Sequence, residues 1–181
     1  SKYWQLSVNN NPSVTGISAY IPLNNDKISL DYLEGPFKDS VEWIADHQNS
    51  DGSFGANYFQ SAFALMALSI AKDKGIEIKN SITSNGVQYF LNNQLNDASF
   101  GDDLSTAVST MALLSNGKTM QELNKNNMTP VDALISRQQN DGGFKSGATS
   151  SDTDTTSWVT MAFVQAGQNL PEKEGKTPID Y

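Results

Sequence analysis

Two closely spaced pairs of carboxylates are the residues best suited to carry chemistry. Asp102 and Asp103 occur in the stretch GDDLST, and Asp152 and Asp154 occur in SDTDTTSW. A carboxyl group can act as a general acid near neutral pH only if its pKa is raised by about three units, which requires roughly 4 kcal/mol of environmental bias. Neighbouring carboxylates also suit a hard cation such as Ca²⁺. Which of these the pairs can do depends on the elements that hold them.

Both pairs stand directly before an apolar segment, where helix capping explains them without catalysis. An aspartate before the first helical turn accepts hydrogen bonds from free backbone amides and favours the positive end of the helix, each effect being about 1 kcal/mol. Because the arrangement occurs twice, we interpret the carboxylates chiefly as caps. Two alternatives stay open. One is catalysis with Asp154 as the acid beside Asp152. The other is a calcium site formed by Asp97, Asp102 and Asp103, or by Asp152 and Asp154.

Composition limits the other kinds of chemistry. The net charge is −8 and there is no basic run, which argues against a nucleic-acid partner. With no cysteine and the single histidine His47, the chain lacks the usual nitrogen and sulfur ligands of catalytic zinc, so no cofactor is predicted. His47 itself reads as a surface or turn-packing residue. The longest apolar run, Ala62 to Leu68, is much shorter than the roughly 20 residues of a membrane span.

A repeated sequence sets the architecture. The segments VEWIADHQNSDGSFG, VQYFLNNQLNDASFG and VDALISRQQNDGGFK share a glutamine at Gln48, Gln94 and Gln138, at intervals of 46 and 44 residues. This period is typical of helical hairpin repeats. We predict an N-terminal extension or strap over residues 1–36, with short β-favouring pieces such as GISAYI, and a repeat region over 37–181. Its units are 37–80, 81–127, 128–175 and the beginning of a fourth at 176, where KTPIDY echoes MTPVDA.

Each unit is predicted to contain two helices. The first carries one apolar stripe, as in Val87, Phe90 and Leu91, and should be an outer, half-exposed helix. The second is apolar nearly all round and should be an inner, buried helix. Glycines that suit a left-handed helix stop follow the inner helices, and prolines stand where the next helix begins. These residues are Gly75, Gly117 and Gly167, and Pro130 and Pro178.

The turn between the two helices reads as structural rather than catalytic. Its aspartates can bond nearby backbone amides, its phenylalanines can fill the space between hairpins, and Gly52, Gly142 and Gly143 permit positive φ. A buried phenylalanine contributes roughly 1.5 to 3 kcal/mol, which is sufficient reason for the recurrence. The turn residues are Gln48, Asp51, Phe54, Gln94, Asp97, Phe100, Gln138, Asp141 and Phe144.

These turns and inner helices resemble the repeats of the terpenoid cyclase and protein prenyltransferase superfamily, the α/α-toroid. They are most similar to the prenyltransferase-like, squalene cyclase-like repeats of secreted bacterial surface proteins, which resemble the cobalamin-carrying domain of intrinsic factor and transcobalamin. SDTDTTSW resembles the acid motif of squalene-type cyclases, with Asp152 and Asp154 matching and Thr155 replacing the last aspartate. The zinc ligands of the prenyltransferases are absent. The resemblance implies an all-α arc of about three helical hairpins, a partial toroid.

The predicted function is that of a non-catalytic binding or scaffold module of an extracellular or cell-surface bacterial protein. The resemblance implies a bulky small molecule such as a corrinoid as one ligand, and a protein or glycan as another. An open arc would expose its inner helices, which suggests a homodimer or a ring completed by other sequence. Since the inner helices should begin at one rim, we expect ligand contacts there, at Tyr58, Gln60, Asp102, Asp103, Asp154 and Trp158. The alternative is a cyclase-like or prenyltransferase-like enzyme that uses Asp154 as general acid.

Overall fold

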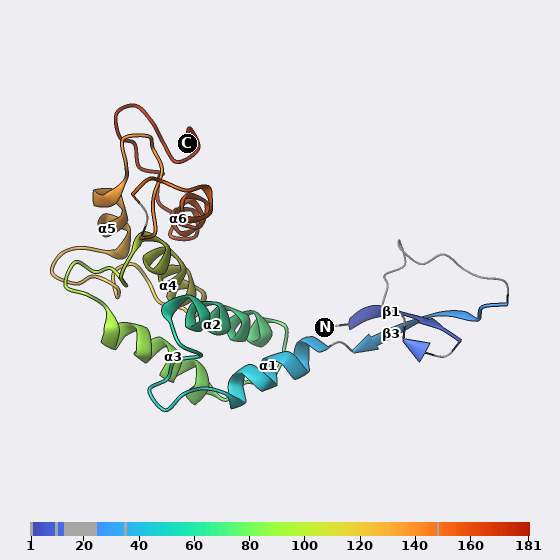
Figure 1. Ribbon diagram of the computed structural model, residues 1–181. Coiled ribbons are helices and arrows are strands. Elements are labelled where there is room, and N and C mark those ends of the chain that lie inside the picture. The colour runs from blue at the N-terminus through green and yellow to red at the C-terminus, as the bar shows by residue number, and fades with distance from the viewer. Residues whose placement is uncertain (1, 10, 13–24, 35, 148) are drawn as a thin grey trace. The chain divides into compact units, whose positions relative to one another are not determined.

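The computed structural model describes residues 2–9, 11–12, 25–34, 36–147 and 149–181 (Figure 1). The chain divides into two compact units, Ser1–Glu42 and Trp43–Tyr181. The described elements are β1 (Lys2–Val8), β2 (Asn11–Pro12), β3 (Ile28–Glu34), α1 (Pro36–Asp46), α2 (Tyr58–Asp73), α3 (Asn80–Asn93), α4 (Asp103–Ser115), α5 (Pro130–Arg137) and α6 (Thr153–Gln165).

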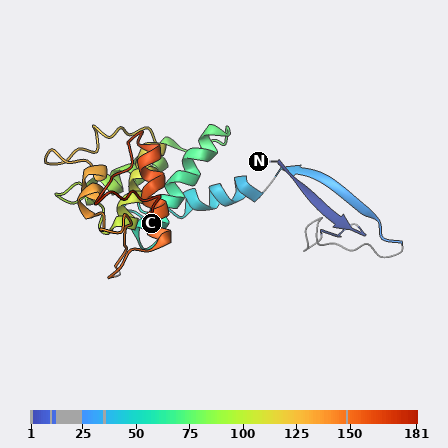
Figure 2. The ribbon, with the colours of Figure 1, turned by 90° about the horizontal axis from the view of Figure 1, so that it is seen from above.

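The first unit contains a three-stranded antiparallel sheet in the order β2-β1-β3. β1 and β3 lie side by side, with Lys2 opposite Glu34 and Val8 opposite Ile28 (Figures 1 and 2). In the extension predicted over residues 1–36, most of the described residues therefore lie in strands, and Pro36 already begins α1. The stretch GISAYI, predicted to favour β structure, lies outside the described residues, and the role of a strap stays a prediction.

The second unit is built from the predicted helix pairs, and the all-α class expected of the repeats is confirmed. α4 packs against both α2 and α6, so the inner helices form a row (Figure 1). They run parallel, because Gln165 near the end of α6 donates to the Ser115 hydroxyl at the end of α4 (2.9 Å), and the Ser69 hydroxyl near the end of α2 donates to the Ser115 carbonyl. The inner helices thus begin at one rim, as predicted.

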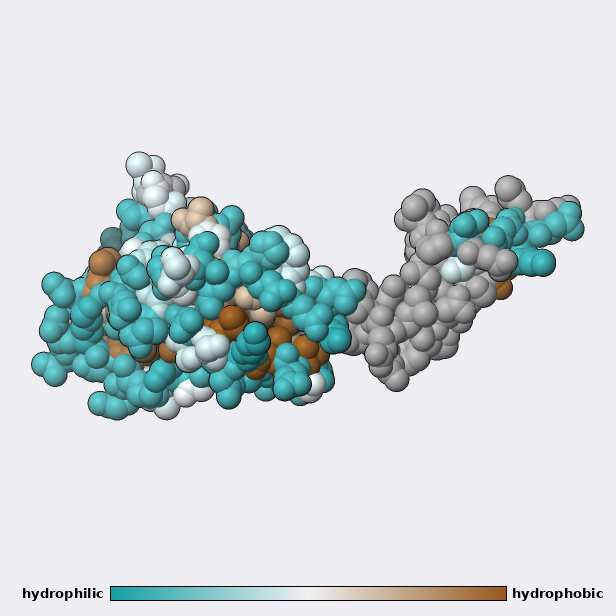
Figure 3. Space-filling view, turned by 90° about the horizontal axis from the view of Figure 1, so that it is seen from below, coloured by the Kyte–Doolittle hydropathy of each residue, from teal (hydrophilic) through white to brown (hydrophobic). Residues whose placement is uncertain are grey.

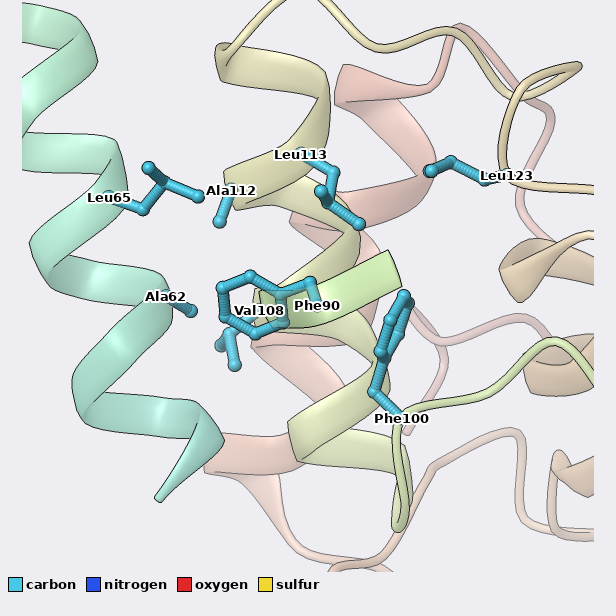
Figure 4. Packing of buried hydrophobic residues seen from close by; sticks show 8 residues of the cluster. All are labelled: Ala62, Leu65, Phe90, Phe100, Val108, Ala112, Leu113 and Leu123. Carbon is cyan, nitrogen blue, oxygen red and sulfur yellow. The ribbon is translucent and has the colours of Figure 1, made fainter. Parts of the chain in front are cut away.

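The outer helices pack where two inner helices meet. α3 contacts α2 and α4, and α5 contacts α4 and α6. Figure 4 shows how this fills the core: the ring of Phe90 on α3 lies between Ala62 and Leu65 of α2 and Val108 and Ala112 of α4. In the next pair Leu134 of α5 takes the same place in a cluster with Ala107, Met111, Val159 and Ala162.

The inner helices are not equally buried, which departs from the prediction. α4, flanked on both sides, buries nine of its residues. α2 and α6 each leave an apolar side in water, at Phe59 and Ile70 and at Met161 and Val164. The physical reason is position in the row, since only the middle helix has an inner neighbour on each side. None of the helices in the described part of the chain combines the length and hydropathy of a bilayer span.

The helix boundaries follow the predicted signals. Gly75, Gly117 and Gly167 adopt positive φ directly after the inner helices. Pro130 is the first residue of α5, which Thr129 and Asp132 close with a capping box. The stretch from Thr177 to Asp180 repeats the aspartate half of that box, because Asp180 accepts from the backbone amide and the hydroxyl of Thr177 (both 2.8 Å).

Candidate functional site

The paired carboxylates begin with two helix caps. Asp102 is the N-cap of α4 and accepts from the amide of Ser105 (2.8 Å), and Asp152 is the N-cap of α6 and accepts from the amide of Thr155 (2.7 Å). Asn57 does the same for α2, bonding the amide of Gln60 (2.9 Å). Each inner helix therefore starts on the same side-chain bond, and capping accounts for Asp102 and Asp152.

These hydrogen bonds lower the pKa values of the two cap carboxylates, which makes both groups poorer general acids near neutral pH. The backbone amide of Thr155 holds the pKa of Asp152 below its ordinary value. Partial burial works to raise the pKa of Asp102, but hydrogen bonds from Ser146 and Ser105 outweigh it, so the net shift is downward. Asp154 lies exposed in the first turn of α6. A carboxyl that must stay protonated near pH 7 needs the opposite environment.

Among the carboxyl groups of the described residues, only that of Asp103 has a raised pKa, and Arg137 lies beside it. Asp103 is only 4% exposed, and this burial raises its pKa. The guanidinium of Arg137 lies 3.6 Å from Asp103 and 2.7 Å from Asp97, and also bonds the carbonyl of Gly101 (2.7 Å). The positive charge between these aspartates is therefore supplied by the chain itself.

That arrangement disfavours a calcium site formed by Asp97, Asp102 and Asp103. A cation bound by Asp97, Asp102 and Asp103 would have to share its site with the guanidinium of Arg137, which repels it. Among the described residues no group of three or more histidine, cysteine, aspartate or glutamate side chains is placed to hold a metal ion.

The predicted rim contacts do not converge on a single site. Gln60 lines an apolar cleft between α1 and α2, whereas Asp102 and Asp103 line a separate polar cleft with Arg137, Lys145 and Lys173. The ring of Tyr58 joins an aromatic cluster, with ring centres 5.9 to 6.5 Å from those of Tyr89, Phe90 and Phe100. Trp158 packs edge-on against Phe63 at 5.1 Å. Tyr58 and Trp158 thus serve the core in part, and Asp154 belongs to neither cleft.

The turn residues have the structural roles predicted for them. The aspartates accept from the amide two residues later, with distances of 2.9 Å at Asp51, 3.1 Å at Asp97 and 3.0 Å at Asp141. The phenylalanines are buried, and each backbone amide donates to a hydroxyl of the following inner helix. The pairs are Phe54 and Ser61, Phe100 and Thr106, and Phe144 and Thr156.

Two turn residues correct the sequence interpretation. Ala98 holds the positive φ (+64°) that Gly52 and Gly142 hold in the other two turns (+90° each). Gly143, which was expected to need positive φ, instead needs space, because a Cβ there would lie 2.7 Å from the Cβ of Ser151. The local sequence did not show which glycine is required for a positive φ and which is required because a side chain would clash.

The turn glutamines do more than mark the repeat. The Gln48 amide donates to the carbonyls of Gly52 and Ile82 (both 2.9 Å), joining its own turn to the next unit. Gln94 bonds the carbonyls of Ala98 and Leu123, which joins its turn to the segment after α4. Gln138 bonds Gly142 and, in the segment after α6, Pro171 and Lys176. Their constant position before the turn was the available signal for this role.

Sequence reasoning missed the apolar cleft, which has a volume of about 680 Å³. Trp43 and His47 form one wall, with their rings stacked at 4.0 Å and His47 Nδ1 2.7 Å from the Trp43 carbonyl oxygen. The spacing of four residues on one helix face was the signal for this pair. The opposite wall comes from α2, through Gln60, Phe63, Ala64 and Ala67.

Comparison with known proteins gives no family assignment, since the chain matches no protein-family model and no curated protein.

Proposed function

We propose that this chain is a non-catalytic binding or scaffold module made of α/α-toroid-type repeats. The observation that carries the proposal is that three of the four paired carboxylates make structural contacts, while Asp154, the candidate acid, is exposed. Asp102 and Asp152 cap helices, and Asp103 is held against Arg137. The extracellular bacterial setting implied by the sequence resemblance belongs to the same proposal.

The parallel row of inner helices supports a scaffold role. Each helix pair repeats the same cap, turn and glutamine bonds, so the region behaves as a stack of equivalent units. Such stacks present extended surfaces rather than one catalytic pocket. The exposed apolar sides of α2 and α6 are the surfaces available for a partner.

The alternative is an enzyme in which Asp154 protonates a polyprenyl substrate. It would require Asp154 to lose contact with water and gain partners that keep it protonated. The exposed position of Asp154, and the lowered pKa of Asp152 beside it, favour the non-catalytic proposal.

Two variants, Asp154→Asn and Asp152→Asn, distinguish the scaffold from the enzyme. The melting temperature and the turnover of a polyprenyl diphosphate are measured for each variant and for the unmodified chain. As a scaffold, the chain should show no turnover in any form. Asp152→Asn should lower stability by at most about 1 kcal/mol, because Asn is also a good cap, and Asp154→Asn by less. Turnover by the unmodified chain that disappears in Asp154→Asn with the fold intact would overturn the proposal.

A further inference from the structure

The helix row lacks one inner neighbour at its α1 end. α3 and α5 each lie against two consecutive inner helices, and their Phe90 and Leu134 are fully buried between them. By the repeat spacing, Ile44 of α1 stands where Phe90 stands in α3, yet it is only half-buried. The adjacent Trp43 is 62% exposed. The packing that buries Phe90 between two inner helices (Figure 4) therefore has no equivalent around Ile44 in the described structure.

The apolar cleft occupies the place of the missing helix. The N-caps Asn57 and Asp102 align α2 with α4 at an offset of 45 residues. At this offset the cleft residues Phe63 and Ala67 correspond to Val108 and Ala112, which pack on α2 in the core. The cleft wall on α2 is thus the surface that an inner helix uses to pack on the inner helix before it.

The opposite end of the row exposes the complementary surface. α4 packs against α2 at Ala62 and Met66, and α6 packs against α4 at the equivalent positions, Ala107 and Met111. With Asp152 as the aligned N-cap, the same positions on α6 are Ser157 and Met161, followed one turn later by Val164. Met161 is 48% exposed and Val164 68% exposed, so this surface has no cover in the described structure.

We propose that the cleft between α1 and α2 binds α6 of a second copy of this chain, in a head-to-tail contact. The interface would repeat the one between α2 and α4 and between α4 and α6, with Met161 and Val164 of one copy against Phe63 and Ala67 of the other. The inference rests on the proposed scaffold function and names its partner. The space-filling view shows groups of hydrophobic residues at the surface of a mostly hydrophilic face of the helical unit (Figure 3).

The segment after α6 sets one steric condition. By the repeat spacing, Ile179 and Tyr181 stand at the positions of Val41 and Trp43 in α1. A docked copy would bring α1 to the place where this tail lies, so the tail must move aside. Ile179 is 71% exposed, and the Tyr181 hydroxyl donates to the Ser151 carbonyl (2.8 Å), while Gln138 holds the segment before them. Tyr181→Phe, which releases that bond, is expected to strengthen association.

The test is the solution mass of the chain by light scattering over a concentration series, with charged variants on each surface. Ala67→Lys blocks the α2 surface and Val164→Lys blocks the α6 surface. Each variant alone should remain monomeric. Mixed together they should form a 1:1 complex that grows no further, since one blocked surface remains on each copy. Gln88→Lys, at an exposed position of α3, is the matched control and should associate like the unmodified chain.

The outcomes separate this inference from the proposed function. Growth in mass for the unmodified chain, its loss in both variants and recovery on mixing would establish the contact. A monomer at every concentration would overturn it, as would association that survives either folded variant. If circular dichroism shows that Ala67→Lys is unfolded, Ala64→Lys on the same surface replaces it. None of these results bears on catalysis, which the Asp154→Asn assay decides separately.

Discussion

At the scale of single residues, the turn shows why a repeated motif tolerates some changes and not others. Ala98 adopts the left-handed backbone that glycine adopts in the neighbouring turns, which costs about 1 to 2 kcal/mol for an alanine. At Gly52 a side chain would cost more than backbone strain, because a Cβ would lie 2.4 Å from the carbonyl oxygen of Asn85. Equivalent positions in a repeat thus carry different constraints, and the neighbouring unit determines which.

Gly52→Ala and Gly75→Ala measure that difference directly. Gly75 also has positive φ (+79°), but a Cβ there would meet nothing within 4 Å. Gly75→Ala should therefore cost only the backbone strain, about 1 kcal/mol, whereas Gly52→Ala adds overpacking and should cost about 2 to 4 kcal/mol. Urea denaturation followed by circular dichroism checks both. Equal losses would show that the contact with Asn85 relaxes.

At the scale of elements, Arg137 joins two helical hairpins. From the end of α5 it bonds Asp97 and Ser99 in the preceding turn and approaches Asp103 at the start of α4. Since Asp103 is buried, its charge needs compensation, which comes from the backbone amide of Lys145 (3.2 Å) and from this guanidinium. Removing one partner of a buried pair costs more than removing both, because it leaves an uncompensated charge.

A double-mutant cycle with Arg137→Met and Asp103→Asn tests this dependence. Arg137→Met alone should lower the free energy of unfolding by about 1 to 3 kcal/mol, a range that allows for the partial exposure of the arginine. Asp103→Asn in the Arg137→Met background should recover part of the loss, because the buried charge is gone. Thermal unfolding of the four proteins at neutral pH gives the coupling. Additive losses would mean that Arg137 acts only through Asp97 and the turn.

The same elements show what the sequence could and could not predict. The helix pairs, caps and turns follow from local patterns, such as the apolar stripe of α3 and the aspartate before α4, and they were predicted. The Arg137 contacts were not, because they join residues about 40 positions apart that follow no period. The calcium alternative was drawn without Arg137 for the same reason, since a list of carboxylates does not reveal the cation beside them. The cleft at Trp43 lies where α1 has only one inner helix beside it in the described structure, and this arrangement cannot be read from the sequence of any one segment.

At the scale of the whole molecule, stability depends on carboxylates that stay ionised. The net charge is −8, and many acidic side chains accept hydrogen bonds that hold their pKa values below the ordinary range. A side-chain bond from Lys118 is the largest cause at Glu122, where the pKa falls to about 2. Asp103 is the opposite case, since its pKa is raised. The other lowered groups are Asp51, Asp97, Asp102, Asp141, Asp152 and Asp180.

The chain should therefore lose stability in acid. A carboxyl whose pKa is lower in the folded state stabilises the fold above its unfolded value, near pH 4, and loses that contribution as the pH falls through the folded value. Protonation of Asp103 stabilises the folded state as the pH falls, because its pKa is raised there. This single contribution is opposed by those of the seven carboxyls whose pKa values are lowered. Urea midpoints should fall steadily between about pH 4 and pH 2. Because Asn caps without titrating, a variant carrying both Asp102→Asn and Asp152→Asn should show a shallower fall. Repeating the series in high salt removes general charge repulsion, and a fall that vanished there would assign the effect to net charge instead of to the caps.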